Sequence, residues 1–397
     1  MKENNYTHYD FTTRVDRTNI GAEKWELMYQ QNPHVKSDVM PMTVADMEFL
    51  TAPEIREGLK QALDLYPNGY AKASDSYKQA IVDWNARRHH WTVQEEWLVD
   101  VINVVSGIHC ALRVLTNPGD GVIITRPVYG PFGESIAMNH RQEVNVPLIE
   151  EDGYYHFDFE AFEQAAQNPK NKAFILCNPH NPVGRVWTPE ELGRMADICV
   201  KNKVYVIADE IWRDIVMPGY TFTPLATVSQ ELAPYLITCA STSKTFNFAG
   251  FKIAHLVIAD DALREKVKQE IHQSRSGSIG QFSYLAAELA YTKGEKWLEA
   301  LLPVLDQNQR LVHEFFKEEI PQIKAPLIEG TYVQWLDFRA LGLSDEALDD
   351  LLYQKAEFIV TPGQAFGEEG QGFRRINLAL PTDVLKEALD RLQRSLS

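Results

Sequence analysis

Ser241-Thr242-Ser243-Lys244 follows directly on the apolar run Leu236–Ala240, and Asp209 closes an earlier apolar run that begins at Val204. Runs this short and this continuously hydrophobic are typical of strands buried on both faces of a parallel sheet. Amphipathic, helix-like segments separate them. Three more runs of the same kind occur in the middle of the chain: Gly121–Arg126, Ala173–Cys177 and Ile253–Ile258. Strand alternating with helix predicts an α/β layered domain.

The last third of the sequence has a different pattern. It predicts a long helix at Trp297–Glu319, strands at Tyr332–Phe338 and Gly372–Leu380, and helices at Ser344–Ala356 and Thr382–Leu396. Strands and helices in this order are an α+β layout. We therefore expect a large α/β domain at residues 49–289. We expect a smaller α+β domain at residues 290–397, which the first 48 residues return to join.

Composition bounds the class of protein. The chain has 397 residues, 45% of them apolar, which is enough for a large core and two domains. A net charge of −16 leaves no basic excess to neutralise phosphates, which argues against nucleic-acid and anionic-membrane partners. The four cysteines form no C-x-x-C pair, and neither they nor the 11 histidines show metal-ligand spacing. No stretch has the length of a membrane span and no leader is evident, so we expect a cytoplasmic protein without a metal.

Polar residues follow three of the predicted strands. Asn178-Pro179-His180-Asn181-Pro182-Val183-Gly184 comes after the run that ends at Cys177, Asp209 ends its run, and Ser241–Lys244 follows the third. Ligands in open α/β sheets bind outside the carboxyl ends of the strands. Each feature alone is weak, because Asn-Pro turns, strand-closing aspartates and Ser-Lys pairs are common. Together, and in this order, they indicate one site.

The residue types at this edge suit pyridoxal 5′-phosphate (PLP). The Lys244 amine can form a Schiff base with the cofactor aldehyde. Ser241 and Ser243 can donate hydrogen bonds to its phosphate. Asp209 can keep the pyridine nitrogen protonated, which lets the ring withdraw electrons from the substrate. Glu210 points to the other face of the strand, so we do not expect a catalytic carboxylate pair.

The sequence resembles fold type I PLP enzymes of the class I/II aminotransferase superfamily over essentially the whole chain. Within that superfamily it is most similar to the carbon–sulfur lyase branch, the MalY/PatB-type cystathionine β-lyases and especially the cystalysin-like enzymes. The stretches that carry this resemblance are Val44–Phe49 (VADMEF), Asn178–Trp187 (NPHNPVGRVW), Ser243–Gly250 (SKTFNFAG), Pro326–Ala340 (PLIEGTYVQWLDFRA) and Arg375–Ala379 (RINLA). The resemblance implies a mostly parallel seven-stranded sheet in the large domain, PLP as cofactor, and a homodimer.

The resemblance also assigns roles. Lys244 would be the Schiff-base lysine and proton shuttle, Asp209 the partner of the pyridine nitrogen, and Arg375 the residue that grips the substrate carboxylate. Asn181 would contact the cofactor ring hydroxyl and the substrate, and Ala45 would lie beside the substrate. The remaining cofactor contacts would be stacking by Tyr129, backbone N–H groups of Gly107 and Ile108 at a helix N-terminus, hydroxyls of Ser241 and Ser243, the side chains of Trp212 and Lys252, and Tyr70 from a neighbouring subunit.

Four positions depart from the branch pattern. Lys252 stands where the wider superfamily often has a phosphate-binding arginine, and Trp212 replaces a histidine or tyrosine. Gly130 replaces a second tyrosine after Tyr129, which would open space. His109 replaces an apolar residue; we interpret it as a polar helix residue rather than a site histidine. We expect these changes to affect substrate preference more than cofactor binding.

The sequence therefore predicts a PLP-dependent carbon–sulfur β-lyase that releases thiol, pyruvate and ammonia. An aminotransferase on the same fold is the alternative, because both reactions begin with removal of the α-proton. A regulatory protein that binds a transcription factor is a third possibility, although no appended binding module is evident. No obvious second arginine awaits a distal carboxylate, which disfavours dicarboxylic amino acids.

Overall fold

The computed structural model describes residues 9–396. Its centre is a seven-stranded sheet in the order β1-β9-β8-β7-β6-β2-β3. The strands are β1 (Leu98–Val101), β2 (Gly121–Ile124), β3 (Gln142–Asn145), β6 (Asn171–Cys177), β7 (Tyr205–Asp209), β8 (Leu236–Ala240) and β9 (Ala254–Val257). The five predicted apolar runs correspond to β2, β6, β7, β8 and β9. The fold is therefore the predicted α/β architecture.

Strand direction agrees with the prediction for all but one of those runs. Strands β3, β2, β6, β7 and β8 are mutually parallel, whereas β9 is antiparallel to both β8 and β1. The expectation that Ile253–Ile258 is a parallel strand was wrong. Only the short helix α8 (Thr242–Thr245) and the turn η4 (Ala249–Phe251) separate β8 from β9. Without a full crossover helix, β9 begins at the sheet edge where β8 ends, and it runs back.

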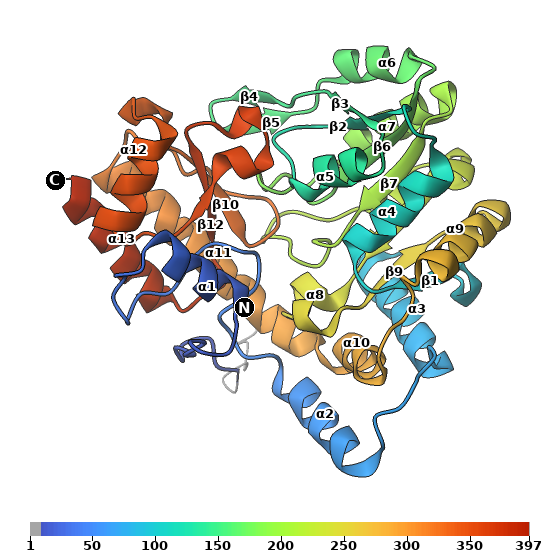
Figure 1. The fold of residues 1–397 in the computed structure, drawn as a ribbon, viewed down its shortest axis with the longest axis horizontal. Helices are drawn as coiled ribbons and strands as arrows, with labels where there is room; N and C mark the ends of the chain where they lie inside the picture. The colour runs from blue at the N-terminus through green and yellow to red at the C-terminus, as the bar shows by residue number, and fades with distance from the viewer. Residues whose placement is uncertain (1–8, 397) are drawn as a thin grey trace.

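Helices cover both faces of the sheet (Figure 1). On one face, α4 (Val104–Leu115), α5 (Pro131–Met138) and α9 (Asp261–Ser274) pack on Ile124, Ile175, Ile207 and Ile237. On the other, α6 (Phe159–Gln167) and α7 (Pro189–Asn202) pack on Phe174, Leu176 and Val206. Successive residues of β6 thus enter opposite cores, as the two-residue period of a strand requires. Burial on both faces explains why these strands are apolar throughout.

A second, three-stranded antiparallel sheet has the order β10-β12-β11, with β10 (Val333–Asp337), β12 (Phe373–Asn377) and β11 (Thr361–Pro362). The long helix α11 (Glu295–Glu319) and the last helix α13 (Thr382–Leu396) agree with the predicted segments. The predicted helix at Ser344–Ala356 is α12 (Asp345–Asp349) followed by a π-helical turn at Asp350–Lys355. The other elements are α1 (Glu23–Gln31), α2 (Pro53–Leu65), α3 (Asp75–His89), α10 (Gln281–Lys293) and the hairpin of β4 (Ile149–Glu151) and β5 (Tyr154–His156).

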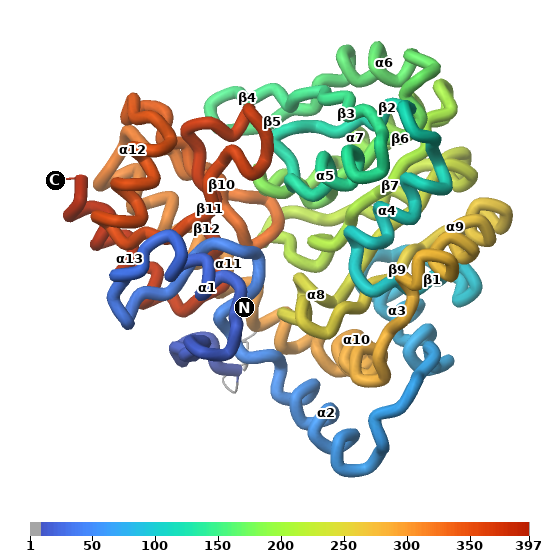
Figure 2. Tube along the Cα trace, viewed as in Figure 1, coloured from blue at the N-terminus to red at the C-terminus, as the bar shows by residue number. Residues whose placement is uncertain are grey.

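The N-terminal segment lies beside the C-terminal helices (Figure 2). Arg14 forms ion pairs with Asp383 and Glu387 on α13. Met42 forms a parallel bridge with Val360 next to the small sheet. The domain limits 1–48 with 290–397, and 49–289, stay predictions. Residues 1–8 and 397 of the predicted small domain lie outside the described part of the chain.

Candidate active site

A cavity of about 520 Å³ opens at the carboxyl ends of β6, β7 and β8. Its wall contains nine of the residues proposed from the sequence: Ala45, Tyr129, Asn181, Asp209, Trp212, Ser241, Ser243, Lys244 and Lys252. They come from separate strand ends and from the segment before α2. The parallel sheet brings them together, because the carboxyl ends of parallel strands share one edge.

Lys244 is the second-last residue of α8, a helix whose start is set by Ser241. The Ser241 hydroxyl accepts from the Ser243 N–H at 3.1 Å and donates to the Ile253 carbonyl at 2.7 Å. The Lys244 ammonium donates to the carbonyl oxygen of Ala45 at 2.7 Å. Burial lowers the pKa of Lys244 to about 8, and the positive charge of Arg375 acts in the same direction. The site therefore holds an amine that can act as nucleophile or base near neutral pH.

Asp209 is the last residue of β7 and is 3% exposed. Its carboxylate accepts a hydrogen bond from the Ile211 N–H at 3.1 Å. Burial raises its pKa to about 7, and the field of Lys244 offsets this shift only partly. Within residues 9–396 this carboxyl forms no ion pair, and a buried carboxyl without one suits a ligand that brings a cation. The protonated ring nitrogen of PLP has that chemistry, so the donor set fits this cofactor.

The N-terminus of α4 reaches the cavity, as expected for a phosphate site. The two residues proposed there need correction. The Gly107 N–H donates to the Asn103 carbonyl, and Gly107 packs on Leu256 of the sheet. Neither Gly107 nor Ile108 is part of the cavity wall, whereas Val104, Val105 and Ser106 are. The helix begins at Val104, about one turn earlier than we expected, so the amides without intrahelical partners are those of its first turn.

Arg375 lies on β12 beside this cavity. Its Nη1 donates to Oδ1 of Asn181 at 3.0 Å, and its guanidinium lies 4.8 Å from the Phe366 ring centroid. Burial lowers the pKa of Arg375 to about 10. Its neighbour Arg374 faces the other way and pairs with Asp345 and Asp349. At 5% exposure, Arg375 is not a surface strand arginine, and its Nε has no partner within residues 9–396.

Two aromatic residues contribute to the apolar part of the wall. Trp212 is buried, packs edge-on against Tyr332 at 4.7 Å between centroids, and has the Lys244 amine 5.5 Å from its ring centroid. The Tyr332 hydroxyl donates to the same Ala45 carbonyl as Lys244, at 2.9 Å. Tyr129 is also part of the wall, and its pKa is raised by burial and by the charge of Asp209. The indole thus helps to fix the lysine amine by packing.

The structure settles the role of His109. Asn139 Nδ2 donates to His109 Nδ1 at 2.7 Å. The orientation of the Asn139 amide is fixed because Arg113 Nη1 donates to Asn139 Oδ1. The Ser135 hydroxyl donates to the Pro131 carbonyl, so His109 Nε2 donates to Ser135 Oγ at 3.2 Å. Both ring nitrogens are occupied, and burial lowers the pKa. His109 borders the cavity as a neutral, structural residue.

Gly130 does not open space, contrary to our expectation. A Cβ at this position would lie 2.5 Å from the Ala365 carbonyl oxygen, so the backbone after β11 occupies the space. Tyr70 lies outside this chain's own cavity and is fully exposed, at 112% of its reference area. Sequence reasoning missed Glu23, Asn103 and Ile211, which also line the cavity. No local pattern distinguishes Glu23 from the other acidic residues that begin helices.

A group of three or more His, Cys, Asp or Glu side chains able to hold a metal ion does not occur within residues 9–396. In the same range, no helix is both long and apolar enough to cross a membrane. The four cysteines are buried free thiols.

Residues 37–392 match the model of the aminotransferase class I and II family, and the chain belongs to that family. It is 36% identical over 388 residues to the cystathionine beta-lyase PatB of Bacillus subtilis (strain 168), covering 98% of this chain and 100% of the relative. A crystal structure of cystalysin from Treponema denticola, which contains a pyridoxal 5′-phosphate cofactor, has a TM-score of 0.96 with 43% identity over 98% of each chain. A PLP-bound putative aminotransferase from Clostridium difficile 630 has a TM-score of 0.94 with 39% identity, over 98% of this chain and 100% of the other.

Proposed function

We propose that this protein is a PLP-dependent carbon–sulfur β-lyase acting on cystathionine or related S-substituted cysteines. The observation that carries the proposal is the Lys244 amine, which has a pKa of about 8 and shares one cavity with the buried carboxyl of Asp209. The similarity to PatB and cystalysin supports the lyase chemistry. The products would be a thiol, pyruvate and ammonia.

The chain's residues divide the work of holding the cofactor. Lys244 would hold its aldehyde carbon, Asp209 its ring nitrogen, and Asn181 with Tyr129 the ring itself. The first turn of α4, Ser243 and Lys252 would hold its phosphate. When bound, PLP supplies the electron withdrawal that makes the substrate α-proton acidic.

The remaining chemistry belongs to the protein. Arg375 would bind the substrate α-carboxylate through its guanidinium fork, which places the Cα–H bond near Lys244. The neutral Lys244 amine would take that proton at Nζ, and a pKa of about 8 leaves part of the lysine neutral at physiological pH. The Ala45 carbonyl, 2.7 Å from Nζ, orients the amine. Electrons released at Cα then expel the thiolate from Cβ, and water completes the conversion to pyruvate and ammonia.

The test is the release of pyruvate and free thiol from L-cystathionine by purified protein supplied with PLP, with Lys244→Ala as control. Equal amounts of both products, absent in the control, are the expected result. No pyruvate, together with amino-group transfer to an added keto acid, would replace the lyase by an aminotransferase. The similarity to the Clostridium putative aminotransferase supports that second candidate.

We also propose a homodimer in which Tyr70 reaches the cofactor phosphate of the neighbouring subunit. Helix α2 lies at the edge of the molecule, where it packs on α10 (Figure 1). Large apolar side chains there are exposed, namely Leu63 at 62%, Leu65 at 69% and Tyr66 at 60%. Surface of this kind next to Tyr70 suits burial against a second copy of the chain. The buried free cysteines support a reducing compartment, and we propose the cytoplasm.

Subunit complementation tests the dimer. Lys244→Ala and Tyr70→Ala are each expected to be inactive. A mixed dimer would contain one intact site, with Lys244 from one subunit and Tyr70 from the other. Because random mixing makes about half of the dimers mixed, about a quarter of the wild-type activity should return. No recovery despite subunit exchange, or a monomeric mass by light scattering, would overturn this arrangement.

A further inference from the structure

Glu23 is a carboxylate on the cavity wall that the chemistry above does not use. It is the first residue of α1 and lines the same cavity as Lys244 and Tyr129. Its side chain is exposed, and it makes no hydrogen bond or ion pair within residues 9–396. Its charge acts on Tyr129 across the cavity and contributes to the raised pKa of that phenol. A charged group inside a ligand cavity with no protein partner is available to a ligand.

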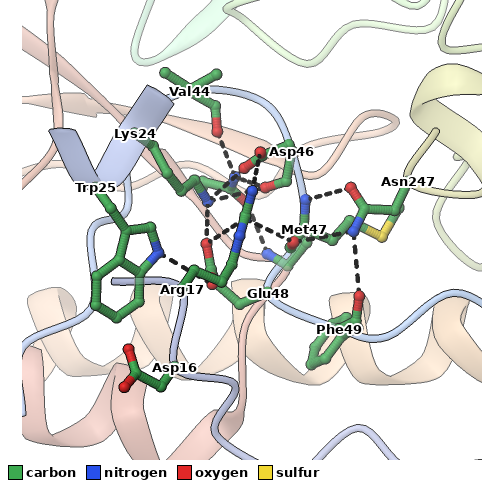
Figure 3. A network of polar contacts seen from close by, with 12 residues as sticks. Asp16, Arg17, Lys24, Trp25, Val44, Asp46, Met47, Glu48, Phe49 and Asn247 are labelled. Atoms are coloured by element: carbon green, nitrogen blue, oxygen red, sulfur yellow. Dashed lines mark hydrogen bonds and ion pairs between the residues drawn. The ribbon is translucent and has the colours of Figure 1, made fainter. Parts of the chain in front are cut away.

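The next residue, Lys24, anchors the start of α1 in a network of polar contacts (Figure 3). Lys24 is 1% exposed and forms ion pairs of 3.0 Å with both Asp46 and Glu48. Its ammonium also donates to the Asp46 carbonyl at 2.9 Å. Arg17 pairs with the same two carboxylates. This partly buried network of Arg17, Lys24, Asp46 and Glu48 fixes the first turn of α1 to the segment that carries Ala45.

The same segment also positions the reacting lysine. Asp46 follows Ala45, whose carbonyl accepts from Lys244. Asn377 donates to the carbonyls of Val44 and Asp46, and Asn247 bonds the backbone of Met47 on the other side. Glu23 and the Lys244 amine are therefore linked through one short rigid segment. The backbone at Glu23 is thereby anchored beside the site, which keeps its carboxylate within the cavity wall.

The other charges near the cavity leave one role for Glu23. Arg375 is committed to Asn181 and, in the proposed reaction, to the α-carboxylate. Lys252 stands on the α8–η4 side, next to the proposed phosphate position, and Asp209 closes β7 at the base of the cavity. Glu23 contributes a further negative charge from α1. None of the cations in the cavity wall forms an ion pair with it.

We propose that Glu23 determines substrate specificity by binding a cationic nitrogen on the substituent carried by the substrate sulfur. The preferred substrates would be S-substituted cysteines with an ammonium group beyond the sulfur, whereas a substituent that carries a carboxylate without an ammonium would be disfavoured. The inference rests on the proposed function and names the substrate class of that site. Electrostatic complementarity of this kind separates substrates that are similar in size.

The test compares three cysteine conjugates of similar length: S-(2-aminoethyl)-, S-propyl- and S-carboxymethyl-L-cysteine. For the wild-type holoenzyme, kcat/KM should fall in that order. Glu23→Gln should lower kcat/KM for the aminoethyl substrate about fivefold, raise it for the carboxymethyl substrate, and leave the propyl substrate unchanged. Glu26→Gln, on the same helix but outside the cavity wall, should change none of the three.

A binding measurement separates recognition from chemistry. L-lysine matches the aminoethyl substrate in length but has no leaving group at Cβ. Calorimetric titration of the holoenzyme should give a weaker affinity for L-lysine in Glu23→Gln than in wild type, with L-norleucine unaffected. If none of the conjugates yields pyruvate, the proposed function fails. If all three react but Glu23→Gln alters them equally, or leaves L-lysine binding unchanged, the role of Glu23 is overturned while the proposed function stands.

Discussion

Arg375 on β12 and Asn181 in the turn after β6 are joined by a hydrogen bond of 3.0 Å, although 194 residues separate them in the chain. This bond connects the small sheet to the large one at the cavity. It uses one arm of the guanidinium and leaves Nε without a protein partner within residues 9–396. An arginine held at one end, with unused donors beside a cavity, is suited to bind a carboxylate.

Replacing Arg375 by lysine should therefore impair substrate binding more than turnover. Lysine keeps the positive charge but loses the planar fork. We expect KM for L-cystathionine to rise about tenfold, which is the loss of about 1.4 kcal/mol of binding, with a smaller change in kcat. Steady-state kinetics on cofactor-saturated protein measures this. An unchanged KM would exclude Arg375 from carboxylate binding.

Asp209→Asn should stabilise the cofactor-free chain at high pH. The pKa of Asp209 is raised from 3.8 to about 7 in the folded state, so folding disfavours its ionised form. Stability of the free protein then falls as pH rises from about 4 to about 7, and the penalty is complete above pH 7. The asparagine variant avoids the penalty, with a gain of up to about 4 kcal/mol. Thermal unfolding at pH 5 and pH 8 checks this, because the gain should be larger at pH 8, where the penalty is complete, than at pH 5, where only part of it is present.

With cofactor present, the same substitution should have the opposite effect. An amide cannot neutralise a protonated ring nitrogen, so Asp209→Asn should weaken PLP binding. Equilibrium dialysis at pH 8 provides the readout. A variant that gained no stability without cofactor and lost no affinity with it would contradict the electrostatic role assigned to this carboxyl.

Lys244 should react as an amine at lower pH than an ordinary lysine. Burial, reinforced by Arg375, lowers its pKa from 10.5 to about 8. Reductive methylation of the cofactor-free protein, followed by mass spectrometry, should give a rate for Lys244 that levels off above about pH 8. A rate that still rises steeply towards pH 10 would show an unperturbed amine. In Arg375→Met, the levelling should move to higher pH, because one positive charge is gone.

Gly130→Ala should destabilise the protein and disturb the cavity. The new Cβ would lie 2.5 Å from the Ala365 carbonyl, and backbone at that position cannot move aside cheaply. Overpacking of this kind costs about 1–3 kcal/mol. Gly193→Ala in α7 is the matched control, since nothing lies within 4 Å of the added carbon. That substitution should be neutral or stabilising by up to about 1 kcal/mol. Denaturant titration measures the free energy of unfolding of both variants. Equal values for the two would mean that the contact with Ala365 is unimportant.

Lys24→Met should be strongly destabilising. The change leaves the buried Glu48 and the half-buried Asp46 with only Arg17 as cation. Removing one partner of a buried ion network costs about 3–5 kcal/mol. We expect a loss of that order in urea titration, with the exposed ion pair of Lys201 and Glu163 as control. Lys201→Met should cost under about 1 kcal/mol. Similar losses for both would mean that the Lys24 network adds little to stability.

Much of the large domain was predictable from local pattern. Strands buried on both faces have no alternating polar residues, which is the pattern of the five apolar runs. Helix α7 starts where Thr188 and Glu191 form a capping box. Asp209, Asn181 and Lys244 could be proposed as neighbours because strand ends at one sheet edge meet. Such features depend on adjacent residues and on the sheet rule alone, so a single sequence contains them.

The tertiary structure decided what depends on contacts between distant segments. The direction of β9 depends on how the chain turns after α8, and the space at Gly130 depends on where Ala365 passes. Glu23 lines the cavity next to Lys24, whose ion pairs with Asp46 and Glu48 join α1 to a segment distant in the sequence. The spacing of side chains along one helix or strand does not reveal these contacts, because they depend on how segments far apart in the sequence pack together. The sequence alone therefore determined the sheet and its lysine, and the folded chain determined which charges face the substrate.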